Sequence, residues 1–109
     1  MNIHDYCTSG GKNIITDYLD QLPERLKLEG YAIRRKIHKD GYQALLYLNT
    51  RQLRGKLWEI KFSQERIMYI LADSDNIYFL HICKKQKGKA EKHEIEKAIT
   101  CAKEADLWK

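Results

Sequence analysis

The sequence is poor in the patterns that build metal centres and disulfide frameworks. Its three cysteines, Cys7, Cys83 and Cys101, are an odd number, lie far apart and include no CxxC pair, a pattern that favours reduced thiols. The four histidines form no metal-ligand motif such as HExxH, in which two imidazoles share one helix face. We therefore expect no metal site and no cofactor.

Long apolar runs are also missing. No window approaches the ~18 consecutive apolar residues that predict a membrane span. The first residues, MNIHDYCTSGGKN, lack the basic start and apolar stretch of a secretory signal. The sequence therefore predicts a soluble, cytoplasmic protein with no membrane contact, and its 109 residues predict one domain over 1–109.

Positive charge is in excess and is unevenly distributed. The chain has 20 Lys and Arg against 15 Asp and Glu, a net charge of +5. Residues 24–69 and 84–109 are net positive, whereas 1–23 and 70–83 are net negative. Two separated basic segments that converge in the fold would suit a nucleic acid, or equally an acidic protein partner.

Apolar periodicity predicts a strand, two helices, three strands and a final helix. The segments expected are a short strand over 2–7, helices over 14–22 and 23–39, a strand meander between 53 and 89, and a helix after Lys89. Residues 42–48 are compatible with either a helical turn or an extended segment. Residues 49–55 are expected to form a polar, basic loop, and Asp73 to Asn76 a turn.

Counting along the meander predicts two faces. With two-residue loops at Gln64–Glu65 and Ser74–Asp75, Lys61 opposes Met68, and Met68 opposes His81. One face then collects an apolar core: Trp58, Ile60, Phe62, Ile67, Tyr69, Leu71, Tyr78, Leu80 and Ile82. The other collects Glu59, Lys61, Arg66, Met68, Phe79, His81, Cys83 and Lys85. This second face is either a functional site or an ordinary solvated face with surface ion pairs.

Several segments together carry a family resemblance. They are, in order, YLDQLPE at 18–24, LRGKLWEIKF at 53–62, ERIMYI at 65–70, FLHICKKQKGK at 79–89 and EIEKAI at 94–99. In these five segments the chain resembles toxins of the RelE/HigB superfamily, specifically the phage-derived Gp49-like branch to which many HigB toxins belong. The resemblance implies an α+β fold: a RelE-like twisted antiparallel sheet with two N-terminal helices and a C-terminal helix.

The resemblance also implies a function. Many such toxins are ribosome-dependent mRNA endonucleases that need no cofactor, and each is inhibited by a cognate antitoxin. The implied partners are a HigA-like helix-turn-helix antitoxin, mRNA and the ribosome, with operator DNA bound by the toxin–antitoxin complex. Two alternatives stay open: a ParE-like toxin that inhibits a topoisomerase without cutting RNA, and a repressor subunit whose basic surface serves complex formation.

The resemblance assigns roles to residues on the second face. Lys61 and Arg66 are expected as phosphate and transition-state ligands, with Lys85 in the same catalytic group. His81 is the candidate general acid or base because its unperturbed pKa is near neutrality, although a satisfied structural histidine is an equal alternative. Glu59 is expected to orient Lys61 or Arg66, with the role of the base itself as the alternative. The expected RNA-backbone contacts are Arg51, Arg54, Lys56, Lys84, Lys87 and Lys89.

Overall fold

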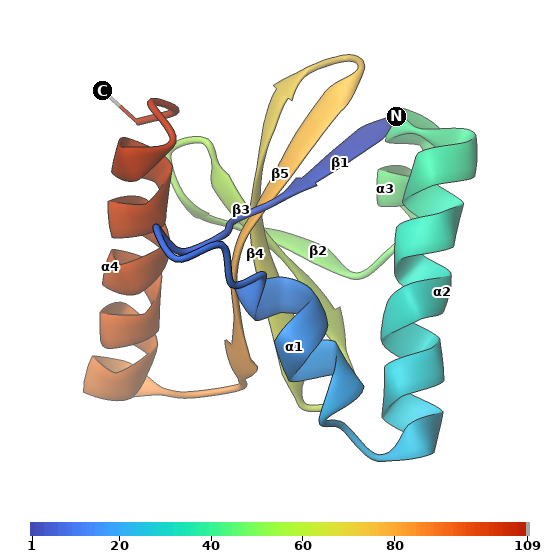
Figure 1. Cartoon of the computed structure of the whole chain (residues 1–109), viewed down its shortest axis with the longest axis horizontal. Helices are drawn as coiled ribbons and strands as arrows, with labels where there is room; N and C mark the ends of the chain where they lie inside the picture. The colour runs from blue at the N-terminus through green and yellow to red at the C-terminus, as the bar shows by residue number, and fades with distance from the viewer. Residues whose placement is uncertain (109) are drawn as a thin grey trace.

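The computed structural model describes residues 1–108 and shows an α+β protein with a five-stranded mixed sheet and four helices (Figure 1). The elements are β1 (Asn2–Asp5), α1 (Ile14–Asp20), α2 (Glu24–Asp40), α3 (Tyr42–Tyr47), β2 (Thr50–Arg54), β3 (Leu57–Phe62), β4 (Glu65–Asp73), β5 (Asn76–Lys84) and α4 (Gly88–Glu104). The strand order is β1-β5-β4-β3-β2. None of these helices is long and apolar enough to span a membrane.

Helices cover both faces of the sheet. Helices α1, α2 and α3 lie on one side and α4 lies on the other (Figure 1). The first side holds the larger core, which includes Ile15, Leu19, Ile37, Ile60, Phe62, Ile67 and Phe79. The second side holds Leu57, Met68, Ile70, Leu80 and Cys83 against Ile95, Ala98, Ile99 and Ala102 of α4. The second face is therefore not an ordinary solvated face, because a helix buries much of it.

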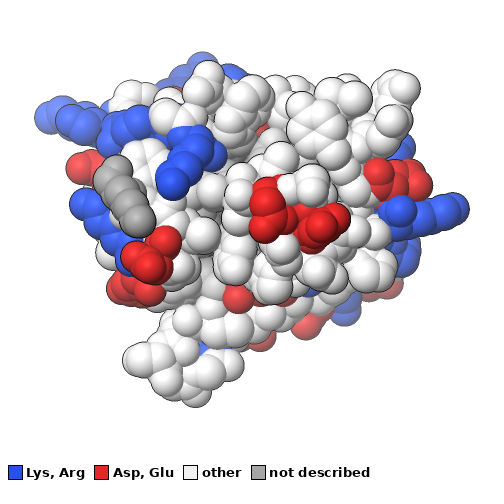
Figure 2. All heavy atoms as spheres, turned by 90° about the horizontal axis from the view of Figure 1, so that it is seen from above, with Lys and Arg blue, Asp and Glu red and all other residues white. Residues whose placement is uncertain are grey.

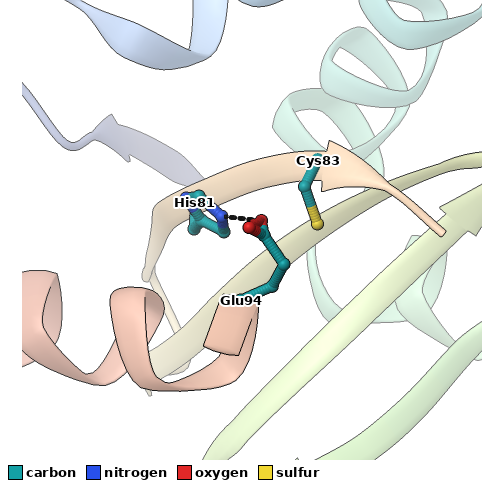
Figure 3. Close-up of side chains that lie close together, drawn as sticks. All are labelled: His81, Cys83 and Glu94. Carbon is teal, nitrogen blue, oxygen red and sulfur yellow. Dashed lines mark hydrogen bonds and ion pairs between the residues drawn. The ribbon is translucent and has the colours of Figure 1, made fainter. Parts of the chain in front are cut away.

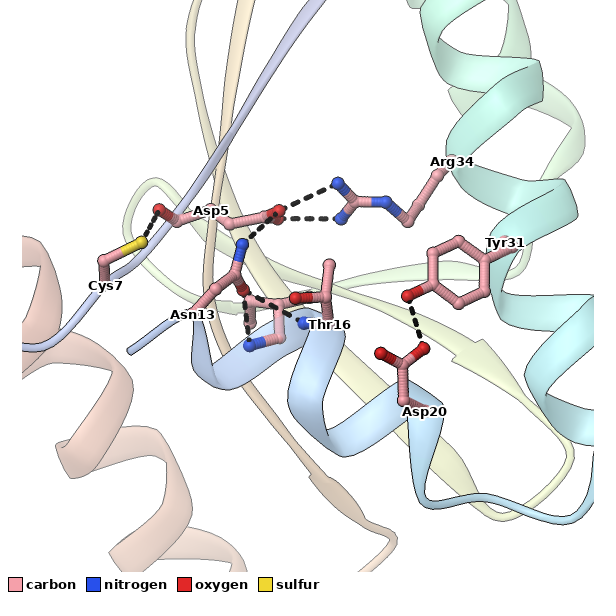
Figure 4. A network of polar contacts seen from close by, with 8 residues as sticks. Asp5, Cys7, Asn13, Thr16, Asp20, Tyr31 and Arg34 are labelled. Atoms are coloured by element: carbon pink, nitrogen blue, oxygen red, sulfur yellow. Dashed lines mark hydrogen bonds and ion pairs between the residues drawn. The ribbon is translucent and has the colours of Figure 1, made fainter. Parts of the chain in front are cut away.

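A polar network attaches the N-terminal strand to α1 and α2. The carboxylate of Asp5 accepts two hydrogen bonds from the Arg34 guanidinium, at 2.7 and 2.8 Å, and one from the Asn13 amide at 3.0 Å (Figure 4). Asn13 also caps α1, because its Oδ1 accepts from the backbone N–H groups of Ile15 and Thr16. Beyond this network, Tyr31 donates to Asp20 and so joins α2 to α1.

The register of β3 and β4 differs from the predicted one by two residues. Lys61 lies opposite Arg66, not opposite Met68, because the turn consists of Ser63 and Gln64. Ser63 adopts a positive φ of 52° there. Glu65 thereby belongs to β4, where its buried carboxylate accepts a hydrogen bond from Tyr18 at 2.6 Å. Because side chains alternate with a period of two, this shift leaves the predicted faces of β3 unchanged.

A β-bulge in β5 reverses part of the predicted face assignment. Met68 lies opposite His81, as predicted, but Tyr69 lies opposite Phe79, so that Leu80 is the extra residue. Phe79 consequently packs in the core under α1 to α3, whereas Tyr78 and Leu80 face α4. The predicted positions of these three residues were wrong, since a single inserted residue inverts every side chain beyond it.

Other differences concern the edges of the sheet. Residues 49–55, expected as a loop, contain the edge strand β2, which is polar and mostly exposed. The sheet is mixed because β1 pairs in parallel with β5, and residues 42–48 contain α3, which makes three N-terminal helices instead of two. Trp58 was expected in the core but is 37% exposed, while the packing role predicted for Tyr69 is confirmed, since it is 4% exposed.

Candidate nucleic-acid interface

The predicted site residues other than Arg54 and Lys56 gather where β5 ends and α4 begins. Across the sheet, Lys61 of β3 lies opposite Arg66 of β4, and Arg66 lies opposite Cys83 of β5. The neighbouring row runs from Arg51 through Glu59 and Met68 to His81. Both rows are on the α4 side, at the end of the sheet where the chain passes from Lys84 to Gly88 (Figure 1).

Arg66 is a buried cation enclosed by acids. It is 2% exposed; its Nε lies 3.2 Å from Oε1 of Glu59, and its Nη1 lies 3.0 Å from Oε2 of Glu91. The Nε and Oε1 atoms approach without the alignment of a hydrogen bond, so this contact is a charge pair only. Arg51 extends the network by contacting both carboxylates, at 3.1 and 3.5 Å. Glu59 therefore orients Arg66 and Arg51, but does not contact Lys61 as an ion-pair partner.

Lys61 and Lys85 form a pair of like charges. Lys61 lies so close to Lys85 that it holds the pKa of the Lys85 ammonium below its usual range, and the charges of Arg66 and Arg51 act in the same direction. Within residues 1–108, neither lysine forms an ion pair with a carboxylate. Two adjacent ammonium groups without a counterion are well suited to bind an anion.

His81 is engaged by a residue that the sequence did not single out. Its Nε2 donates a 2.7 Å hydrogen bond to Oε2 of Glu94 on α4, and its side chain is 14% exposed. Burial alone would raise the pKa of Glu94, but hydrogen bonds from His81 and Lys97 hold that pKa below its ordinary value. His81 is thus a partly buried, oriented imidazole, compatible with either proton transfer or a structural role.

The remaining basic residues divide into two groups. Lys84, Lys87 and Lys89 are exposed around the start of α4, and Lys84 donates to the buried Glu65 at 2.8 Å. Arg54 and Lys56 lie at the β2–β3 turn, beside Gly55, whose added Cβ would be 3.5 Å from Trp108. Trp108 follows the C-terminal end of the 17-residue α4, so Arg54 and Lys56 lie about 25 Å, the length of this helix, from the lysines at its start.

Acidic partners were the part of the site that the sequence analysis missed. Glu91 and Glu94 are three residues apart on α4 and therefore face the sheet together. The sequence shows that Glu91 and Glu94 share one side of a helix, but their contacts with Arg66 and His81 depend on which face of the sheet α4 covers.

Seen from above, the molecule has acidic side chains amid mostly uncharged surface, with Lys and Arg mainly toward the margins (Figure 2). On this face the positive charge therefore lies mainly toward the margins.

Comparison with known proteins gives one clear relationship. No curated protein matches the chain. A family model described as "Phage derived protein Gp49-like (DUF891)" matches residues 17–103, which include all of the candidate site residues. This family is associated with toxins of toxin–antitoxin systems, and the α+β architecture is compatible with a RelE-like fold. The chain belongs to the Gp49-like family of phage-derived proteins, a family of the RelE/HigB toxin type.

Proposed function

We propose that the chain is a HigB-type toxin that arrests translation in the cytoplasm as a ribosome-dependent mRNA endonuclease. The observation that carries this proposal is the pair formed by Lys61 and Lys85, which lie together without a carboxylate partner in residues 1–108. A scissile phosphate would relieve their mutual repulsion. Phosphate contacts of this kind hold RNA by its backbone and leave codon choice to other contacts.

The proposed reaction is an attack within the RNA. The ribose 2′-oxygen bonds to the adjacent phosphorus, the bond to the 5′-oxygen breaks, and the products are a 2′,3′-cyclic phosphate and a 5′-hydroxyl. One group must remove the 2′-proton and another must protonate the leaving oxygen. Lys61 and Lys85 stabilise the charge that develops on the phosphate, and His81, oriented by Glu94, is the candidate for one proton transfer.

Arg66 has an indirect role in this proposal. Its guanidinium is buried and paired with Glu59 and Glu91, so a direct phosphate contact requires Glu91 to leave. The Glu91 carboxylate lies between Arg51 and Arg66, which is the position an RNA phosphate would take. Glu91→Gln would weaken this internal competitor, and we expect the variant to bind RNA more tightly, with a steeper salt dependence. Unchanged affinity would exclude the Arg51–Arg66 pair from the RNA-binding surface.

A HigA-like helix-turn-helix antitoxin is the proposed inhibitor, and the complex of the two proteins is proposed to bind operator DNA. Apolar side chains around a hollow of about 250 Å³ beside the edge strand β2 support a protein partner. Tyr42, Leu46 and Trp58 of its lining are 56%, 62% and 37% exposed, and exposed apolar patches commonly mark protein interfaces. Leu46→Asp should therefore weaken toxin–antitoxin co-purification, while the solvent-facing change Arg35→Asp should not.

The decisive experiment maps messenger 5′ ends after induction of the toxin. We expect new ends within translated codons, and about a hundredfold less cleavage in Lys61→Ala and Lys85→Ala, the loss typical of removing one transition-state contact. Lys103→Ala is the matched control, because Lys103 is an exposed lysine in the last turn of α4. Intact messages together with DNA damage would identify a topoisomerase inhibitor, and full cleavage by both lysine variants would exclude the proposed site.

A further inference from the structure

Three metal-binding donors meet between β5 and α4. A ring nitrogen of His81, the Sγ of Cys83 and a carboxylate oxygen of Glu94 all lie within 4.8 Å of one another, and Nε2 is the nitrogen that contacts Glu94. Figure 3 shows the two strand side chains pointing from β5 toward the carboxylate that α4 supplies. His81 and Cys83 are two residues apart, on the same side of the strand past the bulge, and both face α4.

We propose that His81, Cys83 and Glu94 form a binding site for a single divalent transition-metal ion of the Zn²⁺ type, which clamps α4 to the sheet. One nitrogen, one sulfur and one oxygen ligand suit Zn²⁺, and a water molecule would complete a tetrahedral set. Bond lengths of about 2.0 to 2.3 Å place tetrahedral ligands roughly 3.5 Å apart. The widest pair of donors therefore needs to close by about 1 Å, whereas Nε2 of His81 and Oε2 of Glu94, now 2.7 Å apart, need to separate by somewhat less than 1 Å, and side-chain rotation can supply both movements.

The surroundings favour an ion that neutralises the site. With a neutral imidazole, a thiol and a carboxylate, the cluster carries one negative charge. Binding of a divalent ion displaces the Cys83 thiol proton to solvent and moves the imidazole proton from Nε2 to Nδ1, and the resulting complex is neutral. A neutral complex suits this place, since Cys83 is only 7% exposed and Met68 and Leu80 beside it are fully buried.

Neighbouring charges hold the ligands without blocking the ion. Lys97 donates to Oε1 of Glu94 at 3.2 Å, which leaves Oε2, the oxygen now bonded to His81, for the metal. Burial raises the pKa of the Cys83 thiol to about 12, and the positive charge of Arg66 acts against this shift. That charge is already balanced by Glu59 and Glu91, so it opposes a bound cation only weakly. A metal-bound Nε2 cannot transfer a proton, so the metal site and the proton-transfer role of His81 exclude each other in one molecule; the site stands whether or not the chain cleaves RNA.

The test uses Co²⁺, whose spectrum reports its ligands, on the full chain after treatment with a chelator and a reductant. We expect one equivalent of Co²⁺ to bind with a thiolate charge-transfer band and tetrahedral visible bands, and Zn²⁺ to displace it. Because a ligand that binds only the folded state stabilises it, Zn²⁺ at a hundredfold excess over its Kd should raise the Tm by roughly 10 °C.

Variants distinguish this site from adventitious binding. Cys83→Ser should lose the charge-transfer band, whereas Cys101→Ser, which changes a half-buried cysteine of α4 outside the cluster, should keep it. Glu94→Gln preserves the shape of the side chain and should weaken Co²⁺ binding at least tenfold, so it tests the site even if the Cys83 variant fails to fold. The proposal would be overturned if Co²⁺ did not bind stoichiometrically, if Cys101→Ser lost the charge-transfer band, or if Glu94→Gln bound Co²⁺ with unchanged affinity.

Discussion

Removal of Glu59 should destabilise the fold far more than removal of an ordinary strand glutamate. Glu59 is 1% exposed and lies 3.2 Å from Nε of Arg66, which is 2% exposed. At this distance, an effective dielectric constant of 20 gives an attraction of about 5 kcal/mol. Glu59→Ala leaves Arg66 buried with only Glu91 beside it, and the loss of one partner of a buried pair typically costs about 3–5 kcal/mol.

Urea unfolding of a double-mutant cycle measures this coupling. The cycle compares the native chain, Glu59→Ala, Arg66→Met and the double variant. We expect each single variant to lose stability, and the double variant to be more stable than the sum of the two losses predicts, because it leaves no unpaired buried charge. Asp75→Ala, at an exposed turn, is the control and should change little. A loss below about 1 kcal/mol in Glu59→Ala, or additive losses, would refute the reasoning.

Three further predictions concern α4, α2 and α1. Hydrogen bonding to Arg66 holds the pKa of Glu91 below its ordinary value of 4.5, so the ionised carboxylate stabilises the fold above pH 4.5, and this stabilisation is lost as the pH falls through the lowered pKa. The free energy of unfolding in urea should therefore depend less on acid pH in Glu91→Gln than in the native chain, and the same pH dependence in both would contradict this. Gly30→Ala should destabilise by roughly 1–3 kcal/mol, because its Cβ would lie 2.5 Å from Leu19, whereas Gly10→Ala should be nearly neutral. Asn13→Ala should cost about 1–2 kcal/mol through loss of the α1 cap, measured as a lower urea midpoint, and no shift would mean that solvent replaces the cap.

Elements with strong local signals were predicted well, and elements defined by distant contacts were not. Periodicity located α2 and α4 closely, since each has a regular buried side. Strand β2 was missed because a polar edge strand shows no apolar alternation. The parallel pairing of β1 with β5 joins segments more than 70 residues apart, and no local pattern contains that information.

The candidate site was partly predictable because of where the bulge falls. Lys61, Arg66, Cys83 and Lys85 all lie between the bulge at Leu80 and the end of the sheet from which α4 departs. Over this stretch the only error in register was a shift of two residues, which preserves the faces, so counting placed these side chains on the face where the structure has them. Beyond Leu80 a shift of one residue reverses the faces, and there the prediction failed. The acids of α4 could not be found by counting within the meander, since they reach Arg66 and His81 only because α4 covers that face of the sheet.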